Sequence, residues 1–597
     1  MYLVVLETGG NQRYIFQSNR LRENIGASEL TYRGGTEYVL RAVHNAGGAD
    51  FSEVLGNPAG VRQKILDQNP GGTNGIEVIV ATSGKAMLLV EDVSKAKKIV
   101  RQATATALKE APGLDLCGVV WEVAGDNFGQ TVRNAHQKLQ EIQSQRTGCS
   151  TRYPQLPVVA ECQSTGGPAF GMTDEALRTQ DDRRKPEVTS VWRDVSRSSF
   201  VKGEYFGKWQ VDDEASRHQR RGWRDRLENI CANKLQFAPN PHRLEKDANL
   251  DWLGVVHIDG NGLGLIFLNF ENFLPDGKRD YRTYVNLFRK FSCALEEAAE
   301  TAFCRTLEGD DSWTPKLHDR GKNPFPAFIP LILGGDDVTL VCDGREALPF
   351  TIRFLRNFEE ETGKRQDVAE IIRAATGERE SAVTASAGVA IVKPHFPFHR
   401  AYHLAEQLIN SAKRPIKALF ELGQPRCSSI DFHILYDASY TDLQSIRKRL
   451  VAPDGCLLTT KPYVLLDDDR PHDNDWVNAA NWMGLDKRVE ALNSTTDGRR
   501  LLSSSQMHAL REALHEGTKE ADNQLALVSH RLSASQYNVL REDQSDTLVR
   551  DRTPYPGETS SSSSETTPRK ETRFLDALDV AAFWGVTSGD DQPGSDS

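Results

Sequence analysis

The sequence predicts an α+β protein with two ferredoxin-like (βαββαβ) domains, an irregular insert between them and a helical C-terminal domain. Three observations lead to this prediction. The order strand, helix, hairpin, helix, strand occurs twice along the chain, a polar stretch with little periodicity separates the two copies, and helical spacing dominates after the second copy. A chain of 597 residues is also too long for a single hydrophobic core.

The first copy is expected within residues 1–148. "YLVVLET" opens it as a strand, and helical spacing follows from residue 11 to residue 43. "GIEVIVAT" and "KAMLLVED" flank a Ser-Gly turn and predict a hairpin. A helix over 93–111 and the strand "DLCGVVWEVA" complete the pattern. Residues 149–247 are rich in Arg, Asp and Gln and predict the insert.

The second copy is expected within residues 248–437. "WLGVVHIDG" predicts its first strand, and the next segment places Tyr284, Phe288 and Leu295 on one helical stripe. "FIPLILGGDDVTLVCDG" predicts a hairpin, which a helix over 346–362 and the strand "AVTASAGVAIV" follow. We expect a further helix over 401–414 and a strand over 429–436.

The remaining chain is expected in three parts. Residues 438–545 have helical and charged composition, and residues 546–572 contain the low-complexity run "GETSSSSSETTPRK", which predicts a flexible linker. Residues 573–597 begin with a short amphipathic helix, expected to dock on the helical domain or on a partner, and end in a disordered tail.

Three acids of the second copy are predicted to meet. Asp259 ends the first strand, and Asp336 and Asp337 follow the glycine pair Gly334-Gly335 at the hairpin turn. Neighbouring strands lie about 4.8 Å apart, so the three carboxylates should converge at one end of the sheet. Carboxylates that close repel each other, and Mg²⁺ or Mn²⁺ would relieve the repulsion. A pair of such ions is suited to nucleotidyl transfer.

Other residues near these acids have two interpretations each. Gly260, Asn261, Gly262 and Gly264 form "GNGLG" after Asp259 and either expose backbone N–H groups to a triphosphate or simply make a tight turn. Lys413 is either a phosphate ligand or a lysine favoured at a helix C-terminus. Ser386 is either a polar group near a nucleotide or a small core residue.

The motifs "HIDGNGLG", "LGGDDVTLVC", "SAGVAIVKPHFPF" and "AEQLINSAK", in this order, resemble the catalytic palm of the large polymerase/cyclase subunit of type III CRISPR effector complexes. That palm is related to GGDEF-type cyclases, and "NQRYIFQSNRLRENIGASEL" resembles the first palm of the same family. The resemblance implies synthesis of cyclic oligonucleotides from ATP, with Asp259, Asp336 and Asp337 as metal ligands. It also implies guide RNA, target RNA, other type III subunits and downstream cyclic-nucleotide effectors as partners.

Departures from the family pattern limit what is carried over. In the first copy, Ser83, Gly84, Lys85 and Ala86 stand where acids would fall, and only Glu7 is near, so we expect a non-catalytic domain that holds a second nucleotide. No HD nuclease activity is expected, because the chain begins with its first palm. Cys162 lacks a CxxC partner, with Thr165 at that position, so structural zinc is not expected.

Composition limits the partners and the location of the protein, and two alternative functions remain beside the cyclase. A net charge of −10 argues against general attraction of nucleic acid, and the absence of an 18-residue apolar run predicts a cytoplasmic protein without a membrane partner. A scaffold subunit that binds RNA and protein partners, and nucleotide with little catalysis, is one alternative to the cyclase. A template-independent polymerase with linear products is another.

Overall fold

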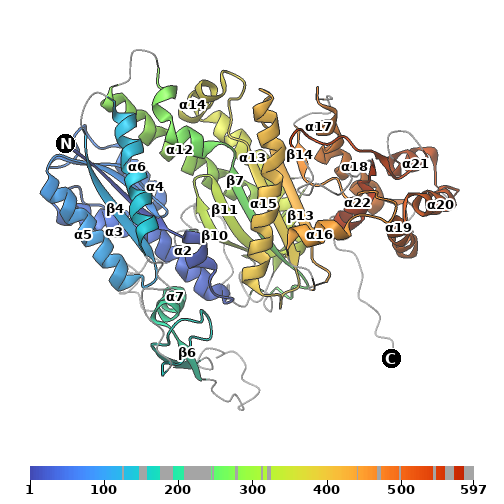
Figure 1. Cartoon of the computed structure of the whole chain (residues 1–597), viewed down its shortest axis with the longest axis horizontal. Helices are drawn as coiled ribbons and strands as arrows, with labels where there is room; N and C mark the ends of the chain where they lie inside the picture. Colours follow the sequence, from blue (N-terminus) through green and yellow to red (C-terminus); the bar gives the residue numbers. More distant parts are fainter. Residues whose placement is uncertain are drawn as a thin grey trace.

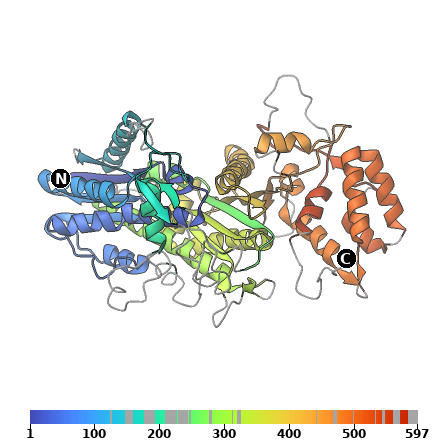
Figure 2. The same cartoon turned by 90° about the horizontal axis from the view of Figure 1, so that it is seen from below.

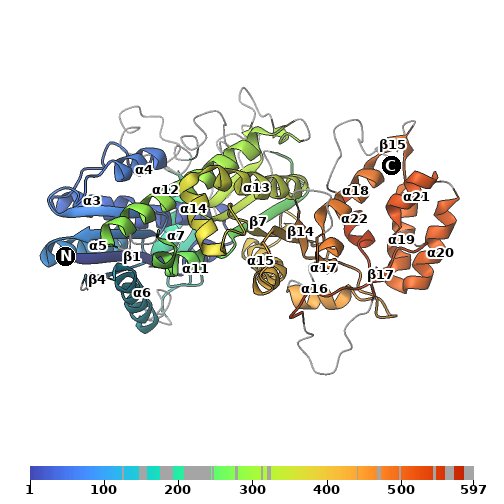
Figure 3. The ribbon, with the colours of Figure 1, turned by 90° about the horizontal axis from the view of Figure 1, so that it is seen from above.

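A computed structural model describes most of the chain, namely residues 1–123, 127–146, 158–174, 192–207, 227, 244, 248–275, 280–310, 313–318, 325–437, 439, 442–466, 472–496, 499–530, 532–541, 546–558, 570–581 and 583. The two βαββαβ domains lie side by side, blue and then green to yellow in Figure 1. The orange and red helices form a lobe at one end of the molecule, as the views from below and above show (Figures 2 and 3).

The first domain has the predicted ferredoxin-like sheet. Its strands are β1 (Tyr2–Gly9), β2 (Ile76–Thr82), β3 (Lys85–Val90) and β4 (Asp115–Glu122), in the order β2-β3-β1-β4 with antiparallel neighbours. Its helices are α1 (Asn11–Phe16), α2 (Leu21–Gly35), α3 (Glu37–Asn45), α4 (Pro58–Leu66), α5 (Val93–Glu110) and α6 (Phe128–Gln145).

The helical spacing over 11–43 is divided into three helices. The α2 helix ends at Gly35, where a Cβ would collide with the backbone of Thr82, Gly84 and Lys85. Glycine therefore lets α2 press directly on the β2–β3 turn, and its low helix propensity favours a break at the same place.

The second domain repeats this topology and extends it. Strands β7 (Leu253–Gly260), β10 (Phe328–Gly334), β11 (Asp337–Asp343) and β12 (Ala385–Val392) have the equivalent order β10-β11-β7-β12. The predicted strand β13 (Ser428–Ile434) runs parallel to β12, and β14 (Tyr463–Leu465) pairs with β13. The α+β prediction with two ferredoxin-like domains is confirmed. β14 lies in the region expected to be helical, where its buried side chains cover the sheet edge.

Two layers of helices cover the second sheet. Gly254 of β7 lies against α13 (Gly344–Lys364), and Gly388 of β12 lies against α15 (Phe398–Glu421). Gly254 pairs with Ile391, and paired residues lie on the same face of the sheet. Ile391 is three residues from Gly388 on β12, and because faces alternate along a strand, Gly388 lies on the opposite face. The helices α13 and α15 therefore pack on opposite faces of the sheet.

The prediction that the last palm helix ends at residue 414 is wrong. The α15 helix continues through Pro415 to Glu421, and Lys413 is therefore not at its C-terminus. Ile416 and Leu419 pack in a buried cluster with Val464 and Trp476, and this packing offsets the hydrogen bond that proline removes.

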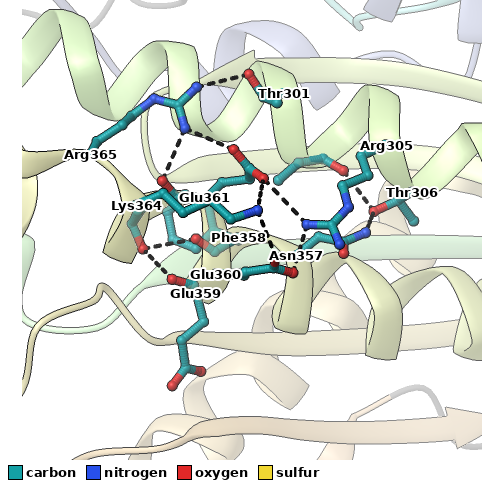
Figure 4. A network of polar contacts seen from close by, with 12 residues as sticks. Thr301, Arg305, Thr306, Asn357, Phe358, Glu359, Glu360, Glu361, Lys364 and Arg365 are labelled. Carbon is teal, nitrogen blue, oxygen red and sulfur yellow. Dashed lines mark hydrogen bonds and ion pairs between the residues drawn. The ribbon is translucent and has the colours of Figure 1, made fainter.

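A network of polar contacts joins α12 (Tyr281–Glu308) to α13 on the same face (Figure 4). Arg305 Nη1 lies 2.6 Å from Glu360 Oε2, and Arg365 donates to Glu361 at 2.9 Å and to Thr301 at 3.0 Å. These contacts join the two long helices side by side.

A polar seam joins the two domains. Glu77 of β2 is buried and binds Arg282 at 2.7 Å and Arg289 at 2.5 Å, both from α12. Arg62 of α4 donates to Glu300 of α12 at 2.9 Å. These ion pairs therefore cross the boundary between the two domains.

The insert and the C-terminal lobe supply the remaining elements. In the insert, α7 (Arg197–Gly207) packs on α2, and Lys202 Nζ donates to the Tyr14 carbonyl at 2.6 Å. The C-terminal helix α22 (Phe574–Ala581) docks on the helical lobe, as predicted, where it packs against α18 (Trp482–Asn493). Its Asp576 also accepts hydrogen bonds from Thr459 at 3.0 Å and from Tyr463 of β14 at 2.8 Å. Residues 559–569 of the expected linker lie outside the described residues, but Tyr555 packs on Trp476.

The other elements are the short helices α11 (Leu263–Leu268), η4 (Phe270–Phe273), α14 (Gln366–Thr376), α16 (Leu443–Arg449) and α17 (Asp475–Ala479), the lobe helices α18 (Trp482–Asn493), α19 (Ser504–Glu516), α20 (Thr518–Ser529) and α21 (Ala534–Leu540), and the two-residue or four-residue strands β5 (Gly171–Asp174), β6 (Trp192–Val195), β8 (Leu317–His318), β9 (Phe325–Pro326), β15 (Thr495–Thr496), β16 (Arg499–Arg500), β17 (Arg550–Asp551) and β18 (Lys570–Glu571). Within the described ranges, no helix is both long and apolar enough to cross a membrane.

Candidate active site

The three acids lie at one end of the second sheet. Asp259 is near the end of β7, Asp336 is in the β10–β11 turn, and Asp337 is the first residue of β11. Val338 pairs with Ile258 on the antiparallel neighbouring strand, so Asp337 and Asp259, one position beyond this pair, lie next to each other. The Gly260 amide also donates to the Asp336 carbonyl at 3.2 Å, which joins the turn to the end of β7.

Burial and mutual repulsion act on the acid pair. Burial, followed by the charge of Asp259, raises the pKa of Asp336 to about 7. Burial raises the pKa of Asp337 as well, and the charges of Asp259 and Asp336 add to the effect. Ionised carboxylates are therefore unfavourable here unless a cation compensates them.

The nearby His257 does not compensate the negative charge of Asp337. His257 Nδ1 lies 3.5 Å from Asp337 Oδ1, but burial lowers the pKa of His257 to about 4, so the imidazole is neutral at pH 7. His257 Nδ1 instead lies 2.9 Å from the Thr339 hydroxyl. Asp337 Oδ1 is buried and has no hydrogen-bond donor among the described residues. Such an oxygen is suited to a cation ligand.

Asp259 is held differently, because Lys413 of α15 forms an ion pair with its Oδ2. In the described part of the chain, no three His, Cys, Asp or Glu side chains are grouped so that they hold a metal ion as they stand. Mg²⁺ commonly takes one or two protein carboxylates and completes its shell with water and phosphate oxygens. Asp336 and Asp337 fit that requirement.

Asn261 and Ser386 lie behind the acids in a buried hydrogen-bonded chain. The Ser386 hydroxyl donates to Asn261 Oδ1 at 2.8 Å and lies 2.8 Å from the Ser429 hydroxyl, which donates to the Ala412 carbonyl at 2.9 Å. Ser386 is fully buried, so it links β12, β13 and α15 and does not open onto the cavity described below.

The glycines of "GNGLG" have different surroundings. Gly262 has φ +80°, and a Cβ there would collide with the guanidinium of Arg426, which donates to the Asn261 carbonyl at 3.0 Å. A Cβ at Gly260 would crowd Asp336. Gly264 is the first of them with open space around it.

A cavity of about 340 Å³ lies between the two ferredoxin-like domains, next to the acid pair. Gly264, Gly334, Gly335, Asp336 and Asp337 line it from the second domain, and Phe267, Phe288 and Leu295 add apolar walls. Asn11, Ser28, Thr31, Thr82 and Lys85 line it from the first domain. A larger cavity of about 440 Å³, next to α2 and α3, contains none of the predicted site residues.

Sequence reasoning missed Glu296 and His257. Glu296 of α12 lines the cavity and accepts a hydrogen bond from Thr82 of the first domain, and burial raises the pKa of its carboxyl. Its partner is distant in sequence, so no local pattern marks it. The alternation of side chains along "VVHIDG" places His257 on the same face as Asp259, and that signal was available.

The first domain has a counterpart of the acid site. In the first hairpin Thr82 pairs with Lys85, and in the second hairpin Gly334 pairs with Asp337 at the equivalent position. Lys85 lies opposite Glu7 on the neighbouring strand, just as Asp337 lies next to Asp259. Both hairpins also carry a bulge at the equivalent place, between Val78 and Val80 and between Pro330 and Ile332. A lysine therefore occupies the position of an acid in this copy.

Two ferredoxin-like domains in tandem, one with an acid pair at its hairpin and one without, define the class of this protein. Residues 252–418 match the family model described as "Cas10/Cmr2, second palm domain". The match is confined to this stretch of the chain, and it confirms the resemblance to the large subunit of type III CRISPR effector complexes.

Solved structures give remote matches. The Csm1–Csm4 cassette in complex with cA4 has 13% identity and a TM-score of 0.45, with 98% of this chain and 69% of that chain covered. The same cassette with AMPPNP has the same identity, TM-score and coverage. Csm1 of T. onnurineus has 14% identity and a TM-score of 0.44, with coverage of 90% and 64%. A search of curated proteins found no significant match.

Proposed function

We propose that the chain is a metal-dependent nucleotidyltransferase that makes cyclic oligonucleotides, with ATP as substrate, in type III CRISPR-like antiviral signalling. The observation that supports this most is the adjacent pair Asp336 and Asp337, both with raised pKa values, at the rim of a cavity between two palms. A partly buried acid pair is costly for a fold to keep, and a cation together with a polyphosphate would compensate it.

In the proposed reaction, the 3′ hydroxyl of one nucleotide attacks the α-phosphate of another and a new P–O bond forms. The phosphoanhydride bond between the α- and β-phosphates breaks, pyrophosphate leaves, and the hydroxyl proton passes to water. Asp336 and Asp337, joined by Asp259 when Lys413 moves away, would hold Mg²⁺ or Mn²⁺. When bound, such ions activate the hydroxyl and neutralise charge on the leaving group. Gly264, Gly334 and Gly335 leave room for phosphates near the acids, and the apolar walls give the nucleotide a surface to pack against.

A scaffold subunit with nucleotide binding and little catalysis is a second candidate. The ion pair between Lys413 and Asp259 favours it, because this pair removes one of the three carboxylates from metal binding. Guide RNA, target RNA and other type III subunits would then be the main partners. In the enzyme proposal the same partners would act as the trigger, and cyclic-nucleotide effectors would act downstream.

The test is incubation of the purified chain with labelled ATP, each other nucleoside triphosphate and Mn²⁺, followed by phosphatase treatment of the products. Phosphatase-resistant products support rings, and phosphatase-sensitive ladders indicate a polymerase with linear products. ATP binding without product, with candidate RNA also present, supports the scaffold.

The matched variant for this test replaces Asp336 and Asp337 together by Ala. We expect turnover to fall at least a hundredfold while the far-UV circular dichroism spectrum is retained. Product formation at the wild-type rate would remove these acids from the mechanism.

A further inference from the structure

Lys85 of the first palm faces the acid site of the second palm. It is the first residue of β3 and stands at the position where the second palm has Asp337. Lys85 and Asp337 both line the cavity between the domains. The two hairpin tips also approach each other, since a Cβ at Gly334 would lie 3.4 Å from the Ser83 Cβ.

The turn that presents Lys85 is tightly constrained. Gly84 has φ +71°, and its carbonyl accepts from the Thr8 amide at 2.8 Å and from the Thr8 hydroxyl at 3.1 Å. The α2 helix lies directly on the turn at Gly35, where no side chain would fit. The backbone of a lysine on such a turn is already fixed, so the protein loses less conformational entropy when this lysine binds a ligand.

Charge in the cavity is unbalanced. Its described ionisable lining consists of Glu296, Asp336, Asp337 and Lys85, so Lys85 is the only cation there. The side chain of Lys85 makes no hydrogen bond or ion pair with any residue in the described ranges, whereas the side chain of Lys413 is bonded to Asp259. A triphosphate entering beside three carboxylates would meet strong repulsion, and a partly buried ammonium group is a strong donor to phosphate oxygens.

We propose that Lys85 binds the polyphosphate of a nucleoside triphosphate in the inter-palm cavity, so that the first palm donates a phosphate ligand to the acid site of the second. This inference rests on the proposed function, because it takes the same nucleotide as substrate. In the first hairpin, a lysine that would bind phosphate directly then stands where the second hairpin has an aspartate that would bind a metal ion.

The experiment compares the affinities of the full chain for ATP and for adenosine, with Mg²⁺ present, by isothermal titration calorimetry. For Lys85→Ala we expect ATP affinity to fall about tenfold and adenosine affinity to stay within about twofold, since adenosine has no phosphate. Lys85→Arg should keep ATP affinity within about threefold. Lys97→Ala removes an exposed lysine of α5 outside the cavity and is the matched control.

An unchanged ATP affinity in Lys85→Ala overturns the inference, and so does an equal loss for ATP and adenosine, which would indicate a structural role. A wild-type protein that binds no ATP overturns both this inference and the proposed function. A wild type that binds ATP but makes no product, while Lys85→Ala loses ATP affinity, supports the phosphate site and overturns the cyclase.

Discussion

Lys413 and Asp259 form an ion pair between the middle of α15 and the end of β7. The pair holds the carboxylate that sequence reasoning assigns to a metal, so a cation and Lys413 compete for Asp259. Binding of a phosphate by Lys413 would release Asp259, and the two events are then coupled.

Replacing Lys413 by Met should therefore raise the affinity of the nucleotide-free protein for Mn²⁺. We expect an increase of about three- to tenfold, because a competing positive charge is removed from the site. Titration followed by the electron paramagnetic resonance signal of free Mn²⁺ measures it. Lys417→Met, which removes an exposed lysine one turn further on, should have no effect. A lower Mn²⁺ affinity in Lys413→Met would contradict the competition.

Asp336→Asn should stabilise the metal-free protein in a defined pH range. The pKa of Asp336 is raised from 3.8 to about 7 in the folded state, so the native protein binds more protons than the unfolded chain between these values. Stability of the wild type is then lost as pH rises from about 4 to about 7. The variant, which has no ionising group at this position, avoids the loss.

The expected gain for Asp336→Asn is about 1 to 2 kcal/mol above pH 7, after allowance for solvent screening, and near zero at pH 4. Urea unfolding of both proteins in chelator at several pH values measures it. Asp67→Asn, at an exposed carboxyl outside the cavity, is the control. A variant that is less stable than the wild type at pH 8 would disprove the repulsion.

Gly262→Ala should destabilise the fold, and Gly264→Ala should not. The first substitution meets both a left-handed backbone conformation and the guanidinium of Arg426, which also binds Glu380 in a buried pair. We expect a loss of about 2 to 4 kcal/mol. Gly264 lies in α11 with open space, so Ala there should change stability by less than about 1 kcal/mol. Equal melting temperatures for the two variants would show that the close approach of Arg426 is not needed.

Glu77→Gln should loosen the seam between the palms. The substitution leaves Arg282 and Arg289 facing a neutral group, and removal of one partner from a buried ion pair costs about 3 to 5 kcal/mol. Thermal unfolding measures this, with Glu122→Gln at an exposed position of β4 as the control. Nucleotide affinity should fall together with stability, because residues of both palms line the cavity. A variant that unfolds like the wild type would mean that the seam is held elsewhere.

Local patterns were sufficient for much of the fold. The apolar runs "GIEVIVAT" and "KAMLLVED" on either side of a Ser-Gly turn, and the glycine pair before Asp336, predicted the two hairpins because strand and turn preferences depend on adjacent residues. The proximity of Asp259 to the acid pair followed from topology alone, since the first strand of a βαββαβ sheet lies beside its hairpin.

The sequence by itself determined the two βαββαβ copies and the placing of the three acids at one end of the second sheet. Only the tertiary structure decided that Lys413 binds Asp259, that Ser386 is enclosed in a hydrogen-bonded chain, and that Lys85 and Glu296 share a cavity with the acids. The physical reason is the distance along the sequence over which each interaction acts. Strand periodicity and turn preference act between neighbouring residues, whereas these contacts join side chains whose partners are distant in sequence and are chosen by how the two palms pack.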